Sequence, residues 1–325
     1  MKICIFGGGS IGGLLAVNLD RIGIKVSVIA RGQHLEVMKK NGLTLINSLG
    51  EETNSTVNCT DDPISLGIQD YLFITIKSPA LLPSLENLKP LVGKNTTIIT
   101  CMNGIPHWYF HKLDNKYANY KIKCLDSDLL IDSILPPDNI VGSVVYPACE
   151  IVKPGTIKHI AGNRFSLGEP DGSESNRLKF ISEILKKAGF RAPIQKNIRD
   201  EIWLKLIGNL SFNPISALTG ATLEQICNDQ GTEAIVKEMM IEAKTIAEKL
   251  GAKINMSIEK RIDGARKVGA HKTSMLQDIE AGKPIEIDSI IVAVRELGEL
   301  TNSPTPNINT ILNLTIQKAK LIGCL

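Results

Sequence analysis

Glycines near the start of the chain limit what its N-terminal segment can form. Residues 2–6 are an apolar run typical of a buried strand, and residues 11–19 carry apolar side chains at helical spacing. Five of the seven residues from 7 to 13 are glycine, which would weaken the signal peptide or membrane helix that this uncharged stretch superficially imitates. A tight turn that joins a strand to a helix explains the glycines better.

The glycines also fit a motif with a specific chemistry. The pattern G-x-G-x-x-G is formed by Gly7, Gly8, Gly9, Ser10, Ile11 and Gly12. Its first glycine allows the tight turn, its second lets a pyrophosphate approach the backbone, and its third lets the helix pack against the strand. The helix N-terminus then offers free N–H groups to phosphate. A purely structural glycine turn is the alternative, but the position between a strand and a helix favours binding of a dinucleotide.

The rest of the first half alternates between short apolar runs and helical segments. Further buried parallel strands are predicted over residues 25–30, 71–76 and 96–100, and a helix over residues 78–91. Such alternation predicts an α/β fold with a doubly wound sheet of the Rossmann type. From residue 140 onward, strand-like segments separated by turn signals predict antiparallel strands that complete this domain, followed by a helix over residues 176–188.

After about residue 197 the chain is predicted to be helical almost to its end. The expected helices cover residues 201–213, 232–250, 258–268, 285–297 and 307–319. A chain of 325 residues is longer than one hydrophobic core usually supports. We therefore expect a dinucleotide-binding domain over residues 1–196 and an all-helical substrate domain over residues 197–325, with the ligand in the cleft between them.

Charge and cysteine content exclude several classes of protein. The net charge is only +3, so no strong field would attract nucleic acid or anionic lipid. Seven cysteines without a C-x-x-C pair indicate reduced thiols in a cytoplasmic protein, and no metal site is expected. A homodimer is compatible with a helical second domain, although the sequence identifies no isologous patch.

Three polar residues follow predicted strands, at the sheet edge where α/β proteins bind ligands. Arg31 follows the second strand, where a carboxylate would select NAD(H); an arginine can instead pair with a 2′-phosphate, so NADP(H) is the expected cofactor. Lys77 follows the third strand and Asn103 the fourth. The alternatives are solvated surface cations for Arg31 and Lys77, and an ordinary Asn-Gly turn at residue 103.

Polar residues also interrupt the helical half. Lys205, Asn209 and Asn213 recur every four residues and share one helical face, which either faces water or lines a polar cleft. Ser274 opens the segment Ser-Met-Leu-Gln-Asp, and Glu286 lies in a predicted helix that is otherwise apolar. From the pattern alone, Glu286 is a favourable charge in the first helical turn.

In this order, these pieces resemble the ketopantoate reductases (2-dehydropantoate 2-reductases) over nearly the whole chain. The resemblance rests on the glycine motif, Arg31, Lys77, Met-Asn-Gly at residues 102–104, the Lys205 helix, and the segments that contain Ser274 and Glu286. It implies an NADPH-dependent oxidoreductase that reduces 2-dehydropantoate to (R)-pantoate, a step toward pantothenate and coenzyme A.

The resemblance also implies roles for single residues. In the family, the lysine matching Lys205 is the general acid, and the glutamate matching Glu286 binds substrate near the new hydroxyl. The residues that hold the substrate's carboxylate and hydroxyl groups match Asn209, Asn213 and Ser274. The residues that touch the cofactor or the reacting end of the substrate match Lys77 and Asn103.

Some features depart from the family pattern and leave the substrate open. Residues 116–137 look longer and more polar than expected, and residues 107–109 place bulky side chains where many relatives have smaller ones. A reductase of another 2-oxo acid would keep every motif named above. A non-catalytic dinucleotide-sensing protein is a further alternative, although it would need neither Lys205 nor Glu286.

Overall fold

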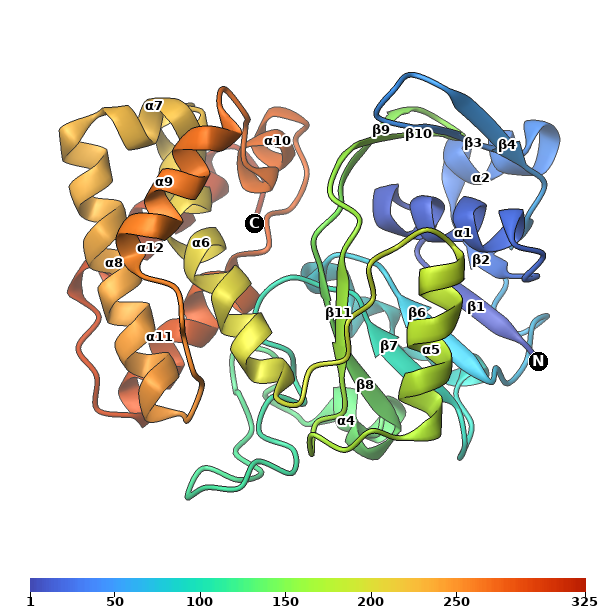
Figure 1. The fold of residues 1–325 in the computed structure, drawn as a ribbon, viewed down its shortest axis with the longest axis horizontal. Helices are drawn as coiled ribbons and strands as arrows, with labels where there is room; N and C mark the ends of the chain where they lie inside the picture. The colour runs from blue at the N-terminus through green and yellow to red at the C-terminus, as the bar shows by residue number, and fades with distance from the viewer. The chain divides into compact units, whose positions relative to one another are not determined.

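The computed structural model describes all 325 residues, and the chain forms two compact units (Figure 1). The first unit consists of Met1–Met102 and Leu129–Ile198, and the second of Asn103–Asp128 and Arg199–Leu325. The predicted boundary after residue 196 would place residues 103–128 in the first domain, whereas in the structure they group with the helical unit. The dinucleotide-binding domain over residues 1–196 and the substrate domain over residues 197–325 stay predictions.

The first unit is built on a seven-stranded sheet in the order β11-β8-β7-β6-β1-β2-β5. All neighbouring strands pair in parallel except β11, which is antiparallel to β8 at the edge. The predicted doubly wound sheet is confirmed. Its strands are β1 (Ile3–Phe6), β2 (Ser27–Ile29), β5 (Asn58–Thr60), β6 (Tyr71–Ile74), β7 (Thr97–Thr100), β8 (Ile140–Val145) and β11 (Phe165–Gly168).

The sheet is held by a hydrophobic core that reaches into its helices. Every residue of β1 is buried, as expected for a central strand of a parallel sheet. Ile3 and Ile5 share one buried cluster with apolar residues from three helices. These helices are α1 (Ser10–Arg21), α2 (Gly32–Asn41) and α5 (Asn176–Lys187).

A second, four-stranded sheet packs beside α1. Its order is β4-β3-β10-β9, and it contains two antiparallel pairs joined by the parallel pair β3 and β10. The sequence predicted strands after residue 140 but not the two earlier ones, which are short and partly polar. The strands are β3 (Leu43–Ile46), β4 (Glu52–Ser55), β9 (Ala148–Lys153) and β10 (Thr156–Ala161).

The helix predicted over residues 78–91 is wrong. This stretch forms three short 3-10 turns and one α-helical turn, α3 (Leu85–Leu88). Pro79, Pro83 and Pro90 each lie at the start of one of the 3-10 turns. Because proline has no N–H to donate and clashes with the preceding turn, each one restarts the helix instead of extending it.

The second unit is mainly helical, as predicted. Helix α6 continues through Pro214, beyond residue 213, where the predicted helix ended. Buried residues on both sides of the proline, including Leu210 and Ile215, hold the helix in the core despite the lost hydrogen bond. The helices are α6 (Ile198–Thr219), α7 (Leu223–Asn228), α8 (Gln230–Lys249), α9 (Ile258–Val268), α10 (Ser274–Glu280), α11 (Ala293–Leu300) and α12 (Pro306–Leu321).

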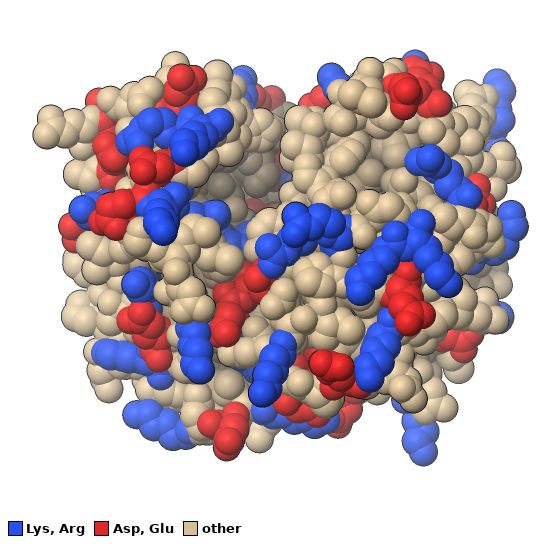
Figure 2. All heavy atoms as spheres, viewed as in Figure 1, with Lys and Arg blue, Asp and Glu red and all other residues tan.

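The surface carries charges of both signs. Figure 2 shows Lys and Arg side chains interspersed with Asp and Glu on the face in view, in keeping with a net charge of +3. No helix combines the length and the hydropathy needed to cross a membrane.

One carboxylate makes three of the hydrogen bonds that tie the segment Asn103–Asp128 to the helical unit. Glu296 of α11 accepts hydrogen bonds from the backbone N–H groups of Lys123 and Cys124, at 2.8 and 2.9 Å, and from the Tyr120 hydroxyl at 2.9 Å. Burial alone would raise the pKa of Glu296, but these donors outweigh it and hold the pKa below its ordinary value.

This carboxylate should contribute to stability in a pH-dependent way. A lowered folded-state pKa means that the contribution is present above the unfolded pKa of about 4.3 and is lost as the pH falls through the folded pKa. We expect Glu296→Gln to lower the free energy of unfolding by about 1–3 kcal/mol at pH 7. Urea unfolding at pH 7 and near pH 3 measures this difference, which should shrink in acid.

Glu299→Gln on the same helix is the matched control. Glu299 is exposed and makes only a 3.9 Å ion pair with Arg295, so its replacement should change stability by less than about 0.5 kcal/mol. Equal losses in the two variants, or a Glu296→Gln loss that is the same at both pH values, would contradict the assigned role.

Candidate functional site

The glycine loop between β1 and α1 has two positions where no side chain fits. The Gly7 backbone has φ +114°, and the N–H groups of Gly7 and Gly8 donate to the Ile29 carbonyl at 3.0 and 2.8 Å. A Cβ on Gly12 would collide with the Gly7 carbonyl oxygen and lie 2.7 Å from the Thr75 hydroxyl oxygen. Gly7 and Gly12 are therefore required by the turn and by helix packing.

Gly9 differs from these two glycines because a Cβ there would meet nothing within 4 Å. Gly9 precedes the twelve-residue helix α1 and caps it without a side-chain hydrogen bond. The first N–H groups of a helix have no partners within the helix, and they attract anions. The space over Gly9 and the helix end beneath it fit a bound phosphate group.

The other predicted cofactor residues of this unit follow the strands beside β1. Arg31 comes just after β2, as the exposed N-cap residue of α2. Lys77 comes just after β6, at the start of a 3-10 turn, and is exposed. Because β2 and β6 flank β1, the glycine loop, Arg31 and Lys77 all follow the carboxyl ends of adjacent parallel strands. After β1 the chain adds β2 and β5 on one side and then β6 on the other, so the strand order reverses between β1 and β6. Such switch points are where open α/β sheets bind ligands.

Thr75 is a further residue of this loop that the sequence analysis missed. Its hydroxyl donates to the Gly7 carbonyl at 2.7 Å and lies 3.2 Å from the Phe6 carbonyl oxygen. It thereby fixes the loop from the neighbouring strand. A threonine directly after the apolar run of β6 was the available signal.

In the helical unit, the structure brings three of the predicted residues into one hydrogen-bonded group. The Lys205 ammonium donates to Asn103 Oδ1 at 2.7 Å, and Asn103 Nδ2 donates to Glu286 Oε2 at 2.9 Å. An ammonium can only donate and a carboxylate can only accept, so the amide of Asn103 must lie in this orientation. The ordinary-turn alternative for residue 103 does not account for this bridge.

Glu286 reaches this group from a segment that is not helical. The residue precedes the first helical turn that follows it, so its interpretation as a first-turn charge is wrong. Its neighbour Ile285 donates its N–H to the Cys324 carbonyl at 3.0 Å, which ties the segment to the end of the chain. The Glu286 side chain is only 5% exposed, and a buried carboxylate requires partners of this kind.

The two asparagines of α6 continue along the face of Lys205. Lys205 and Asn209 are partly buried, and Asn213 is only 5% exposed, so the stripe does not face water along its length. Asn213 Nδ2 is buried and has no hydrogen-bond partner. A buried amide without a partner is unfavourable, so this donor fits an oxygen atom of a bound molecule.

The structure does not bring Ser274 into the group formed by Asn103, Lys205 and Glu286. Ser274 is the exposed first residue of α10, and Thr273 caps that helix by accepting from the Leu276 N–H at 3.3 Å.

The bulky residues 107–110 form part of the packed interior of the helical unit. Trp108, Tyr109 and Phe110 are each at most 1% exposed. The Trp203 indole N–H donates to the Tyr109 hydroxyl at 2.7 Å, and the Arg199 guanidinium donates to the Tyr109 carbonyl at 2.7 Å. These contacts support a packing role for this segment.

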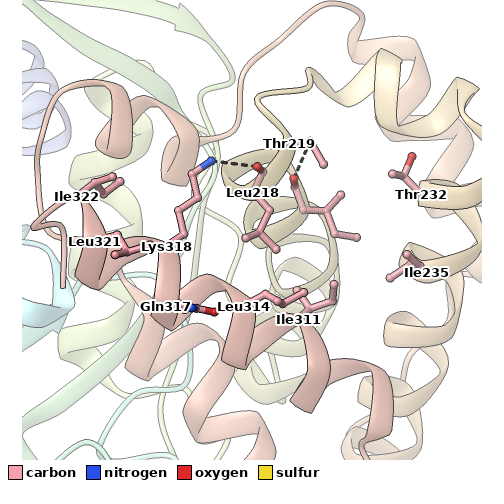
Figure 3. A pocket seen from close by; sticks show the side chains of 11 residues that line it. Leu218, Thr219, Thr232, Ile235, Ile311, Leu314, Gln317, Lys318, Leu321 and Ile322 are labelled. Atoms are coloured by element: carbon pink, nitrogen blue, oxygen red, sulfur yellow. Dashed lines mark hydrogen bonds between the residues drawn. The ribbon is translucent and has the colours of Figure 1, made fainter.

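A separate pocket of about 440 Å³ lies among α6, α8 and α12 (Figure 3). Its lining includes none of the predicted site residues. Figure 3 shows Lys318 reaching the end of α6, where its ammonium donates to the Ala217 and Leu218 carbonyls at 2.6 and 2.9 Å. Lys318 thus stabilises the C-terminus of the helix that carries Lys205. Elsewhere, no group of three His, Cys, Asp or Glu residues could hold a metal ion.

Comparisons with known proteins cover both units. The family model described as ketopantoate reductase PanE/ApbA matches residues 3–172, and the model of its C-terminal part matches residues 197–319. The chain belongs to this family. A 2-dehydropantoate 2-reductase from Mesorhizobium japonicum is 47% identical over 325 residues, which span 100% of this chain and 99% of that protein.

Solved structures agree with the assignment to this family. A candidate ketopantoate reductase from Ralstonia solanacearum superimposes with a TM-score of 0.95 at 37% identity, covering 100% of this chain and 99% of that one. A D-mandelate dehydrogenase bound to NADH and anilino(oxo)acetate has a TM-score of 0.85 at 20% identity, covering 99% and 100% of the two chains. This second likeness concerns the fold alone.

The two kinds of glycine in the loop should respond differently to substitution. We expect Gly12→Ala to lower the melting temperature by several degrees or to prevent folding, because the new methyl group collides with the Gly7 carbonyl. Gly9→Ala should leave the melting temperature within about a degree, since its methyl group points into open space and its φ of −68° suits any residue. Calorimetry of both variants measures this, and equal losses would contradict the packing argument.

Proposed function

We propose that this protein reduces 2-dehydropantoate to (R)-pantoate with NADPH, in the biosynthesis of pantothenate and coenzyme A. The hydrogen-bonded group of Lys205, Asn103 and Glu286 carries the proposal, because Asn103, itself bonded to Glu286, holds the Lys205 ammonium in position. The relative from Mesorhizobium japonicum, 47% identical over the full chain, supports this substrate.

The residues of the first unit fit NADPH. The open space over Gly9 would receive the pyrophosphate at the N-terminus of α1, and Arg31 would pair with the 2′-phosphate. Lys77, and Asn103 of the second unit, would contact the cofactor or the reacting end of the substrate. When bound, NADPH supplies a hydride to the C2 carbonyl of the substrate.

Lys205 would be the general acid of this reaction. Reduction of the carbonyl places negative charge on its oxygen, so an ammonium within hydrogen-bonding distance both stabilises that charge and donates the proton. Asn103 accepts one hydrogen bond from this ammonium and so orients it. Glu286 would bind the substrate near the new hydroxyl group.

The remaining polar residues would orient the acid. The unpartnered Nδ2 of Asn213 suits a carboxylate or hydroxyl oxygen of the substrate. Asn209 lies one turn earlier on the same face, and Ser274 would contribute a hydroxyl group. Neutral donors of this kind hold a small polar acid without adding charge to the site.

The direct test is the initial rate of NADPH oxidation with 2-dehydropantoate beside a panel of other 2-oxo acids, including phenylglyoxylate. High efficiency with 2-dehydropantoate supports the proposal. If the protein turned over only a different acid, the proposed reaction would stand and the proposed substrate would be wrong. Phenylglyoxylate is in the panel because a D-mandelate dehydrogenase shares the fold. A protein that binds NADPH but reduces none of them would fit a sensing role.

Cytoplasmic location and a homodimer stay predictions, as does the absence of a nucleic-acid partner. Size-exclusion chromatography with light scattering would settle the oligomeric state.

Loss of the proposed acid should slow the chemistry and spare the cofactor. We expect Lys205→Ala to lower kcat by about 100-fold or more, as is usual when a general acid is removed, with the NADPH dissociation constant nearly unchanged. Lys237→Ala is the matched control, because Lys237 lies on α8 of the same unit and pairs only at the surface with Glu259. Wild-type turnover in Lys205→Ala would exclude the assigned role.

Cofactor choice should depend on Arg31. We expect Arg31→Ala to weaken NADPH binding at least 10-fold and NADH binding much less, because only NADPH carries the 2′-phosphate. Arg21→Ala, at the far end of α1, should change neither affinity. Fluorescence titration with both cofactors measures the ratio, and equal weakening of the two would mean that Arg31 acts only on structure.

A further inference from the structure

The loop that carries Asn103 makes a close contact next to the bridge between Lys205 and Glu286. Gly104 has φ +88°, which side-chain-bearing residues rarely adopt. A Cβ on Gly104 would lie 2.5 Å from the carbonyl carbon of Ser289 and 2.6 Å from its Cβ. The absence of a side chain therefore sets how closely the Asn103 loop approaches the segment after Glu286.

The partner in this contact is an unusual helical turn. Asp288–Val292 form a π-helical turn just before α11, and Ser289 within it is 2% exposed. A π turn is wider than an α-helical turn and changes which carbonyl groups the helix itself uses. The Ser289 carbonyl accepts a hydrogen bond from the Ile105 N–H at 2.8 Å, outside its own helix.

We propose that Gly104 and the Ser289 carbonyl are positioning groups that hold the Asn103 amide between Lys205 and Glu286. The chain is anchored on both sides of this contact. Ile105, on one side of Gly104, is bonded to Ser289, and Asn103, on the other side, is bonded to Lys205 and Glu286. Glu286 lies only two residues before the π turn. One segment therefore fixes the Glu286 carboxylate and also the Asn103 amide that donates to it.

This inference rests on the proposed function, because it assigns the contact an effect on Lys205 as acid. A small displacement of Asn103 would move the acceptor of the Lys205 ammonium. Misplacement of a catalytic group by about 1 Å can cost about 100-fold in rate. The residues at this contact would act through Asn103 and would touch neither substrate nor cofactor.

The test compares Gly104→Ala with Gly251→Ala. Gly251 has a similar φ of +92° in the same unit, but its nearest neighbour would be 3.8 Å from a Cβ, so it controls for backbone strain without the collision. We expect Gly104→Ala to lower kcat at least 10-fold with the NADPH dissociation constant within about twofold of wild type. Gly251→Ala should keep kcat within about twofold.

A double variant separates positioning from general damage to the fold. If Gly104 acts through Asn103, the double variant Asn103→Ala, Gly104→Ala should have a kcat less than about twofold below that of Asn103→Ala alone. Independent, multiplicative losses would overturn the proposal. Wild-type kcat in Gly104→Ala, or an equal loss in Gly251→Ala, would also overturn it.

A second measurement does not require activity. The side-chain NH2 signals of Asn103, identified by their absence from the Asn103→Ala spectrum, should shift in Gly104→Ala and stay in place in Gly251→Ala. Unshifted signals in Gly104→Ala would refute the inference. If the wild-type protein reduced no 2-oxo acid, the proposed function would fail, and these signals would still decide whether Gly104 positions the amide.

Discussion

The turn between β1 and α1 depends on glycines at which a side chain cannot fit. Gly12 lies against the Gly7 carbonyl and the Thr75 hydroxyl, and a Cβ on Gly13 would lie 2.7 Å from Ile157 of the second sheet. Because α1 therefore approaches β1 on one side and β10 on the other, both sheets of the first unit are organised around this helix. The same close approach leaves the space over Gly9 clear.

The helical unit depends on a different kind of constraint, a polar group held inside apolar surroundings. Glu286 is nearly buried, and its carboxylate is acceptable there because Asn103 donates to it. The Asn103 amide also accepts a hydrogen bond from the Lys205 ammonium. The three residues therefore join a helix, a loop and the non-helical segment of Glu286. Such a group is costly to leave incomplete, which makes it a source of structural specificity as well as chemistry.

The sequence predicted features that depend on local pattern. The glycine turn, the parallel strands and most helices followed from spacing and residue type, and the family resemblance named the residues of the candidate site. Sequence pattern could not predict that Asn103 joins Lys205 to Glu286, because each of these two contacts spans more than a hundred residues. The helix expected over residues 78–91 failed where three prolines outweighed its apolar spacing, and α6 passed Pro214 because burial outweighed the proline.

The hydrogen bond from Ile285 to Cys324 has a practical consequence for handling the protein. Cys324 is 1% exposed and lies one residue from the end of the chain, so the terminus is part of the support for the segment that carries Glu286. Removal of Cys324 would remove that support.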